Sequence, residues 1–149
     1  MAIKISPEHF DPLQEVQDYQ DANPLMAGGF GATCIFIGTM RDFNEGDDVV
    51  GMTLEHYPGM TEKHLQAIVD EAESKWPVIN ALIVHRVGDI LPNDPIVLVA
   101  IWTSHRGDAF DANRYIMEAL KSRAPFWKKE HLQSDQSRWV EKNTDGYKK

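Results

Sequence analysis

The ten residues from 95 to 104, PIVLVAIWTS, limit the fold of this chain more than any other stretch. Nearly all of them are apolar, and Ile, Val and Trp are common in strands. A short apolar run without alternating polar residues is typical of a strand that is buried on both faces. We therefore expect this segment to form a fully buried strand.

Other stretches also predict strands. Residues 30–39, FGATCIFIGT, alternate in polarity and are rich in β-forming residues, and glycines precede them as turn punctuation. The polar stretch 41–49 follows, and residues 50–57 alternate again. We therefore expect residues 30–57 to form a long β-hairpin around a mobile loop. Residues 79–88, INALIVHRVG, predict a further strand.

Two segments predict helices. Residues 60–76, which end before Pro77, carry apolar side chains at helical spacing. Residues 107–123 predict a second helix, with Ser104 or Asp108 as its N-cap. The buried side of this second helix is expected to contain Phe110, Tyr115, Ile116, Ala119 and Leu120.

Pro125 disfavours helix at the residue before it, so residues 125–132, PFWKKEHL, are expected to continue as extended chain. The resulting class is α+β, with helices packed on a mainly antiparallel sheet. A length of 149 residues and a hydrophobic content of 42% suit one domain better than two. We expect a single domain over residues 1–149, with a strand and helix in 1–29 and a tail at 143–149.

The composition argues against several classes of function. The formal net charge of −8 argues against sequence-independent binding of nucleic acid, which needs many Lys and Arg contacts to phosphate. No apolar run is long enough for a membrane span, and the first residues lack the apolar core of a signal peptide. The single Cys34 excludes an internal disulfide and fits a reducing compartment. We therefore expect a cytoplasmic protein.

The stretch 120–130, LKSRAPFWKKE, concentrates Lys121, Arg123, Lys128 and Lys129 in this acidic chain. The simpler interpretation is that Lys121 and Arg123 only complement the dipole in the last turn of a helix. On an extended segment successive side chains point to opposite faces, so only one of the two later lysines shares a pocket with Lys121. Two lysines in one pocket would lower each other's pKa and allow proton transfer near neutral pH.

A second basic group lies where the buried strand ends and the second helix begins. His105 and Arg106 occupy this turn, and free backbone N–H groups at a helix N-terminus favour a phosphate or carboxylate. Arg41, at the end of the strand 30–39, is a candidate for the same ligand. The alternative is that all three side chains are simply solvated.

Other sites fit the sequence less well. The segment GGFGA precedes a strand and has no Lys-Ser/Thr after it, so it predicts a turn rather than a nucleotide-binding loop. The acidic stretch 42–48 lacks the final acid of a calcium loop, and the histidines show no metal-ligand spacing. Cys34 lies among apolar residues and is expected to be a core residue rather than a nucleophile. We expect no metal and no other cofactor.

Four stretches together carry a resemblance to a known family: TLEHYPGMTEKHLQAIVDEA, VHRVGDILPND, TSHRGDAF and LKSRAPFWKKE. From Gly31 to Val140 the chain resembles the large, catalytic subunits of molybdopterin synthase. The resemblance implies a fold of the α/β-hammerhead type. It also implies the addition of two sulfurs to cyclic pyranopterin monophosphate, which opens the cyclic phosphate and forms a dithiolene.

In this family the sulfur comes from a small ubiquitin-like partner that carries a thiocarboxylate on its C-terminal Gly-Gly tail, and the tail enters a pocket of the large subunit. The resemblance therefore implies a sulfurtransferase in molybdenum cofactor biosynthesis. It also implies a heterotetramer, with a dimer of large subunits at its centre. A catalytic cysteine is not needed in this scheme.

The resemblance also assigns roles to residues. Lys121 and Lys128 match the family's catalytic lysines. The expected substrate-binding residues are Thr39, Met40, Arg41, His105, Arg106, Lys129 and Glu130. A basic residue of the neighbouring large subunit is expected to complete each pocket, and the candidates for it are Arg138 and Lys142, where lysine replaces the family's arginine fork.

Two other functions fit the same residues. A Schiff-base enzyme acting on a phosphorylated substrate would use one of these lysines covalently. A non-catalytic module would bind the Gly-Gly tail of a partner in the basic groove without turnover.

Overall fold

The structure is a computed structural model and describes residues 1–140. Within this range, no helix is both long and apolar enough to cross a membrane. In chain order the elements are β1 (Ala2–Ser6), α1 (Pro12–Ala22), η1 (Pro24–Met26), β2 (Ala32–Thr39), β3 (Phe43–Asn44), β4 (Asp47–His56), α2 (Met60–Lys75), β5 (Val78–Arg86), β6 (Gly88–Ile90), β7 (Pro95–Thr103), α3 (Arg106–Arg123), β8 (Phe126–Leu132) and β9 (Ser137–Val140).

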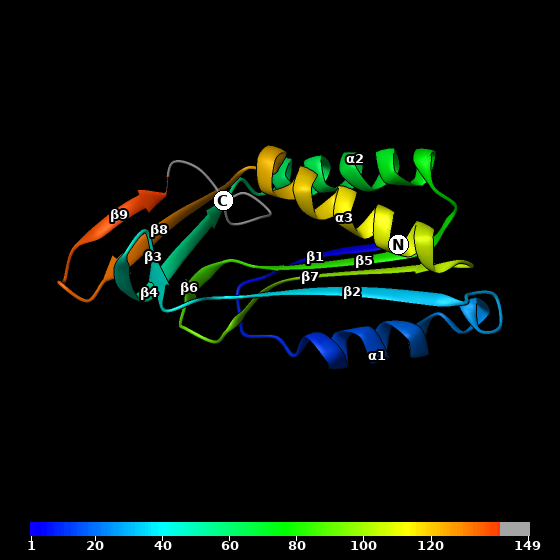
Figure 1. The fold of residues 1–149 in the computed structure, drawn as a ribbon, viewed down its shortest axis with the longest axis horizontal. Helices are drawn as coiled ribbons and strands as arrows, with labels where there is room; N and C mark the ends of the chain where they lie inside the picture. The colour runs from blue at the N-terminus through cyan, green and yellow to red at the C-terminus, as the bar shows by residue number, and fades with distance from the viewer. Residues whose placement is uncertain (141–149) are drawn as a thin grey trace.

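The first sheet has the strand order β1-β5-β7-β2. β1 runs parallel to β5, and the other neighbours are antiparallel. Helices α2 and α3 cover one face of this sheet and α1 covers the other (Figure 1). Ile96 to Thr103 on the central strand β7 are all buried, which confirms the prediction from the apolar run. β2 is an edge strand, because β7 is its only partner within residues 1–140.

A second sheet lies beyond the end of the first (Figure 1). Its strand order is β3-β4-β8-β9, and β6 pairs with β4. The predicted long hairpin over residues 30–57 is therefore wrong, because β2 pairs with β7 and β4 pairs with β8. A register shift between Gly38 and Thr39 marks the place where the chain leaves the first sheet for the second. The only hairpin in this region is the short β3–β4 turn.

The predicted helices are confirmed, with two local corrections. α3 begins at Arg106 with His105 as its N-cap and has no side-chain cap, so neither Ser104 nor Asp108 caps it. Ile116 and Leu120 are buried as expected, but Phe110 is 64% exposed. Phe110 follows the buried Ala109, and each helical residue is turned by about 100° from the one before it, which directs Phe110 away from the sheet.

The described part of the chain is thus α+β with a mainly antiparallel arrangement, as predicted. The largest core lies between α2, α3 and the first sheet, a second core lies under α1, and a third joins the second sheet to the end of the first. A single domain over residues 1–149 stays a prediction, because residues 141–149 lie outside the described range.

Candidate active site

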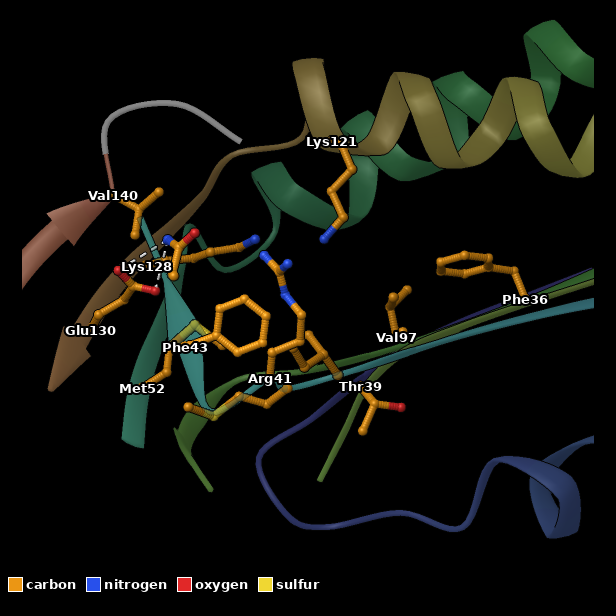
Figure 2. A pocket seen from close by; sticks show the side chains of 14 residues that line it. Phe36, Thr39, Arg41, Phe43, Met52, Val97, Lys121, Lys128, Glu130 and Val140 are labelled. Carbon is orange, nitrogen blue, oxygen red and sulfur yellow. Dashed lines mark hydrogen bonds between the residues drawn. The ribbon is translucent and has the colours of Figure 1, made fainter. Parts of the chain in front are cut away.

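A cavity of about 220 Å³ lies where the two sheets meet the end of α3. It is open to solvent and has three basic side chains on its wall, Arg41, Lys121 and Lys128 (Figure 2). The complete lining consists of Phe36, Gly38, Thr39, Met40, Arg41, Phe43, Asn44, Met52, Ile96, Val97, Lys121, Lys128, Glu130 and Val140.

The two lysines reach the cavity from different elements. Lys121 lies in the last turn of α3, and Lys128 lies on β8, which begins at Phe126 directly after the helix-ending proline. In Figure 2 the amino groups of Lys121 and Lys128 and the guanidinium of Arg41 point toward one another. The proline ends the helix, and the chain continues as strand, so that a helix residue and a strand residue seven positions later share one site.

Burial and mutual repulsion change the basicity of this pair. Burial is the main cause that lowers the pKa of Lys121 to about 7, and the charge of Lys128 lowers it further. Burial also lowers the pKa of Lys128, although a hydrogen bond with Lys121 and the charge of Glu130 oppose this effect. This hydrogen bond favours neutral Lys121 and charged Lys128, so Lys121 is the amine acceptor and Lys128 the ammonium donor when one of the two is protonated.

Arg41 is held by its neighbours along the chain. Met40, which is 5% exposed, accepts a backbone hydrogen bond from Asn93 and donates one to Asp94, at 2.9 and 3.0 Å. The guanidinium of Arg41 lies 5.4 Å from the ring centroid of Phe43. The turn before β7 therefore fixes the backbone next to Arg41, and an aromatic ring supports its charged end.

A buried histidine lies behind the lysine pair. His85 on β5 is 1% exposed, and its ring stacks on Phe126 at a centroid distance of 3.8 Å. Its Nδ1 donates to the backbone carbonyl of Arg86 at 2.8 Å. Burial lowers the pKa of His85 to about 3, and the charges of Lys121 and Lys128 lower it as well. The ring is therefore neutral at physiological pH and adds no further positive charge.

The structure brings together six of the residues singled out in the sequence: Thr39, Met40, Arg41, Lys121, Lys128 and Glu130. Lys129 is on the other face of β8, with its amino group 5.5 Å from the ring centroid of Trp139. Strand alternation predicted this orientation. Lys129 therefore does not line the cavity of its own chain, and its contact with a substrate stays a prediction.

His105 and Arg106 do not reach the cavity of their own chain. They lie at the first turn of α3, and Lys121 lies near its end, which corresponds to a rise of about 22 Å along the helix. The expectation that both residues hold the same ligand as Arg41 is therefore corrected for a single chain.

Arg138, expected as a contact to a neighbouring subunit, bonds instead to Glu130, Asp47 and Asn44 of its own chain. Its contact with a neighbouring subunit stays a prediction. The other candidate for the neighbouring contact, Lys142, lies outside the described residues.

Sequence reasoning missed the apolar and amide part of the wall, which includes Phe36, Phe43, Asn44, Met52 and Val140. Phe43 and Asn44 fall in a stretch that was predicted as a mobile loop. A partial signal was present there, since Gly46 suits the second position of a tight two-residue hairpin, although Glu45 is not a residue that such turns favour. The other residues carry no chemical signal that separates them from core residues.

Cys34 is not part of the cavity lining. Burial raises the pKa of its thiol, which keeps it protonated and a poor nucleophile. The chemistry available in the cavity is thus the binding of anions by Arg41 and Lys128, together with proton transfer through Lys121.

A basic pocket with a paired, low-pKa lysine is typical of enzymes that act on small anionic substrates. The family model described as MoaE protein matches residues 5–123, and the chain belongs to this family. A curated molybdopterin synthase catalytic subunit from Pseudomonas aeruginosa is 48% identical over 141 residues, which are 95% of this chain and 91% of that protein. The resemblance inferred from the four sequence stretches is thereby confirmed.

Solved structures agree with this assignment. The molybdopterin biosynthesis MoaE protein from Burkholderia ambifaria is 48% identical with a TM-score of 0.79, and the match covers 98% of this chain and 94% of that one. Molybdopterin synthase from Staphylococcus aureus is 34% identical with a TM-score of 0.81, and the match covers 92% and 95% of the two chains. The fold is therefore that of the family along nearly the whole chain.

Proposed function

We propose that this chain is the catalytic subunit of a molybdopterin synthase, converting cyclic pyranopterin monophosphate to molybdopterin with sulfur from the thiocarboxylated Gly-Gly tail of a small partner. The observation that carries the proposal is the Lys121–Lys128 pair, which shares a hydrogen bond beside Arg41 in the basic cavity of a MoaE-family fold. A cytoplasmic location stays a prediction from the sequence.

The three cations have different tasks in this proposal. Arg41 and protonated Lys128 bind the anionic groups of the substrate and of the thiocarboxylate, because charge-assisted hydrogen bonds are strong in a partly buried site. In each cycle the thiocarboxylate sulfur attacks a substrate carbon that carries oxygen, and a carbon–sulfur bond forms as the carbon–oxygen bond breaks. In one cycle the leaving oxygen belongs to the phosphate, which opens the cyclic phosphate. In the other cycle the oxygen takes a proton from Lys128 and leaves as water while the carbon–carbon double bond of the dithiolene forms. Negative charge that develops on the substrate is stabilised by Lys128.

The second step releases the sulfur to the product. Water adds to the acyl carbon of the tail, the acyl–sulfur bond breaks, and the tail leaves as a carboxylate while the sulfur stays on the pterin. Neutral Lys121 is the general base that takes the proton from this water, because its pKa of about 7 leaves a large fraction unprotonated at neutral pH. Two such cycles give the dithiolene.

His105 and Arg106 join the site through a second copy of the chain. A cavity of about 220 Å³ is smaller than most small-molecule sites, ~300–1,000 Å³, so another surface is needed to enclose a pterin phosphate and a peptide tail. A neighbouring large subunit is the expected partner in this family. The basic turn before its α3 supplies the missing anion-binding groups.

The edge strand β2 is the surface through which two copies meet. It carries Ile35, Phe36 and Ile37 with exposures between 37% and 41%, and an exposed apolar edge strand readily pairs with another chain. Ala32 at its start pairs with Thr103, next to His105, and Arg41 follows its end. Antiparallel pairing of β2 with its symmetry copy places the start of one strand beside the end of the other.

A Schiff-base mechanism is the second candidate, because the low pKa of Lys121 also suits a nucleophilic amine. One reconstituted reaction separates the two functions. The protein is mixed with the cyclic substrate and a small partner that bears a thiocarboxylated Gly-Gly tail, and dithiolene-containing product is measured. Product that forms equally with and without borohydride supports sulfur transfer.

Loss of activity with borohydride, together with a stable adduct on Lys121, would support the Schiff base instead. Tight binding of the tail without product would indicate a non-catalytic module that binds the partner's tail.

A further inference from the structure

Arg138 on β9 joins two parts of the second sheet that are far apart in the chain. Its Nε donates to Glu130 Oε1 at 3.0 Å. Its two terminal nitrogens donate to Asp47 Oδ2 at 2.7 Å and to the backbone carbonyl of Asn44 at 2.9 Å. One guanidinium thus connects β8, which carries Lys128, to the β3–β4 hairpin.

The Glu130 carboxylate is the centre of this connection. Glu130 is 7% exposed and lines the cavity on the same face of β8 as Lys128. Besides Arg138, it accepts hydrogen bonds from Asn44 Nδ2 at 3.0 and 3.2 Å (Figure 2). A buried carboxylate is costly unless it is paired and hydrogen-bonded, and here both oxygens have donors. The positive charge of Arg138 therefore compensates the negative charge of Glu130, so the cavity keeps its positive character.

The β3–β4 hairpin is too short to be stable by itself. β3 contributes only Phe43 and Asn44 to pairing, and a ladder of this length is not stable alone. Glu45 and Gly46 have φ angles of 52° and 83°, which suit a tight two-residue turn. The hairpin directly follows Arg41 and brings Phe43 against the Arg41 guanidinium. The turn before β7 fixes the backbone at Met40, and the position of the hairpin therefore decides where the guanidinium end of Arg41 lies.

We propose that Arg138 and Asn44 are positioning residues that clamp the β3–β4 hairpin to Glu130 and thereby hold Arg41 and Phe43 on the cavity wall. The clamp also fixes the Glu130 carboxylate next to the Lys128 ammonium. This inference rests on the proposed function of the cavity only where turnover is concerned, since the clamp itself has consequences that need no substrate.

The first test compares variants in the reconstituted reaction. Arg138→Gln and Asn44→Ala are expected to lower kcat/KM by about tenfold to hundredfold, mainly through KM for the cyclic substrate, because Arg41 loses its position. Arg138→Lys should not restore activity, since one ammonium cannot serve the three acceptors of the arginine fork.

The matched control for these variants is Lys4→Gln. It removes an ion pair of 2.8 Å between β1 and α1, away from the cavity, and is expected to keep wild-type kinetics. A normal KM in both clamp variants would overturn the inference.

The second test needs no substrate. The groups that face Lys128 are Lys121 from α3, Arg41 after β2, Glu130 on its own strand and the buried, neutral His85 on β5. Removing a positive charge beside Glu130 leaves its negative charge less compensated, so Arg138→Gln is expected to raise the pKa of Lys128. Glu130→Gln is expected to lower it. The pKa of Lys128 in each of the two variants is read from its side-chain NMR signals.

Hydrogen exchange on the same samples reports the hairpin itself. Arg138→Gln is expected to speed exchange of the amide of Val49, which donates to Asp42 across the hairpin, while amides of β7 stay protected. Unchanged exchange and an unchanged pKa of Lys128 in Arg138→Gln would overturn the clamp. If both change but the wild-type protein forms no product, the clamp stands and the proposed reaction fails.

Discussion

Lys128 on β8 donates a hydrogen bond to Lys121 in the last turn of α3, and both amines lie in one cavity. In this pair the lowered pKa of Lys121 makes its neutral amine available as a base, while the hydrogen bond to Lys121 favours the charged form of Lys128. The same site therefore offers a proton acceptor and an anion-binding group.

The pH dependence of turnover follows from this pair. Lys121 has a pKa of about 7 and must be neutral to act as a base, so the single-turnover rate should rise as pH increases through about 7. At higher pH the rate should fall again when Lys128 loses its proton. Rates measured between about pH 5.5 and 10 test this bell shape. A rate that decreases through pH 7 would mean that Lys121 has to be protonated.

Mixed dimers test whether His105 and Arg106 act on the neighbouring pocket. Arg106→Ala and Lys121→Ala are each expected to be inactive as homodimers. A mixed dimer has one pocket with both native residues, so random mixing should restore about a quarter of wild-type activity. Recovery is measured after the two variants are unfolded and refolded together. No recovery would show that Arg106 does not act on the neighbouring pocket, and an active Arg106→Ala homodimer would place Arg106 outside catalysis.

The pairing of two copies through the edge of β2 can be tested by placing a charged side chain on this strand. Ile35 and Ile37 are about two-fifths exposed and do not line the cavity, so Ile37→Lys should weaken pairing of two copies without changing the pocket directly. Analytical ultracentrifugation should then show a shift toward monomer, with a parallel loss of activity. Leu25→Lys is the control, because Leu25 is fully exposed on η1. Wild-type association of Ile37→Lys would exclude this edge.

Acid should destabilise the fold through His85. Its folded-state pKa is about 3 and its ordinary value is 6.5, so the unfolded state binds more protons between these values. Stability is therefore lost as pH falls through this window, by about 2 kcal/mol between pH 6.5 and 5. The pKa of Glu71 is lowered to about 2 from 4.5, so this carboxylate contributes only at lower pH.

Urea unfolding at several pH values between 6.5 and 5 measures this slope. His85→Phe, which keeps an aromatic ring against Phe126, should be less stable at pH 7 but should lack the pH dependence. If the free energy of unfolding of His85→Phe fell with pH as steeply as that of the wild type, groups other than His85 would cause the acid sensitivity.

Local patterns predicted those parts of the fold that depend on local chemistry. The apolar run of β7 required burial on both faces, Pro77 ended α2, and alternation along β8 placed Lys128 and Lys129 on opposite sides. Each of these features is decided by residues that are adjacent in sequence. The catalytic-lysine assignment came from the family resemblance, and the cavity geometry agrees with it.

Long-range pairing was beyond such reasoning. Two alternating segments on either side of a polar stretch suggested a hairpin, but β2 and β4 each have better partners far along the chain. The internal use of Arg138 was equally hidden, because its acceptor Asp47 lies 91 positions away. An arginine fork can serve its own chain or a neighbour, and only the tertiary structure decides between them.

The most direct test of the central claim is the reconstituted reaction with Lys121→Ala and Lys128→Ala. Loss of a stabilising or proton-transferring group in such a site costs about 10²- to 10³-fold in rate. We predict at least this loss of dithiolene product for both variants, with native circular dichroism for both and with unchanged binding of the small partner for Lys121→Ala. Product formation at the wild-type rate by either variant would contradict the role of the lysine pair.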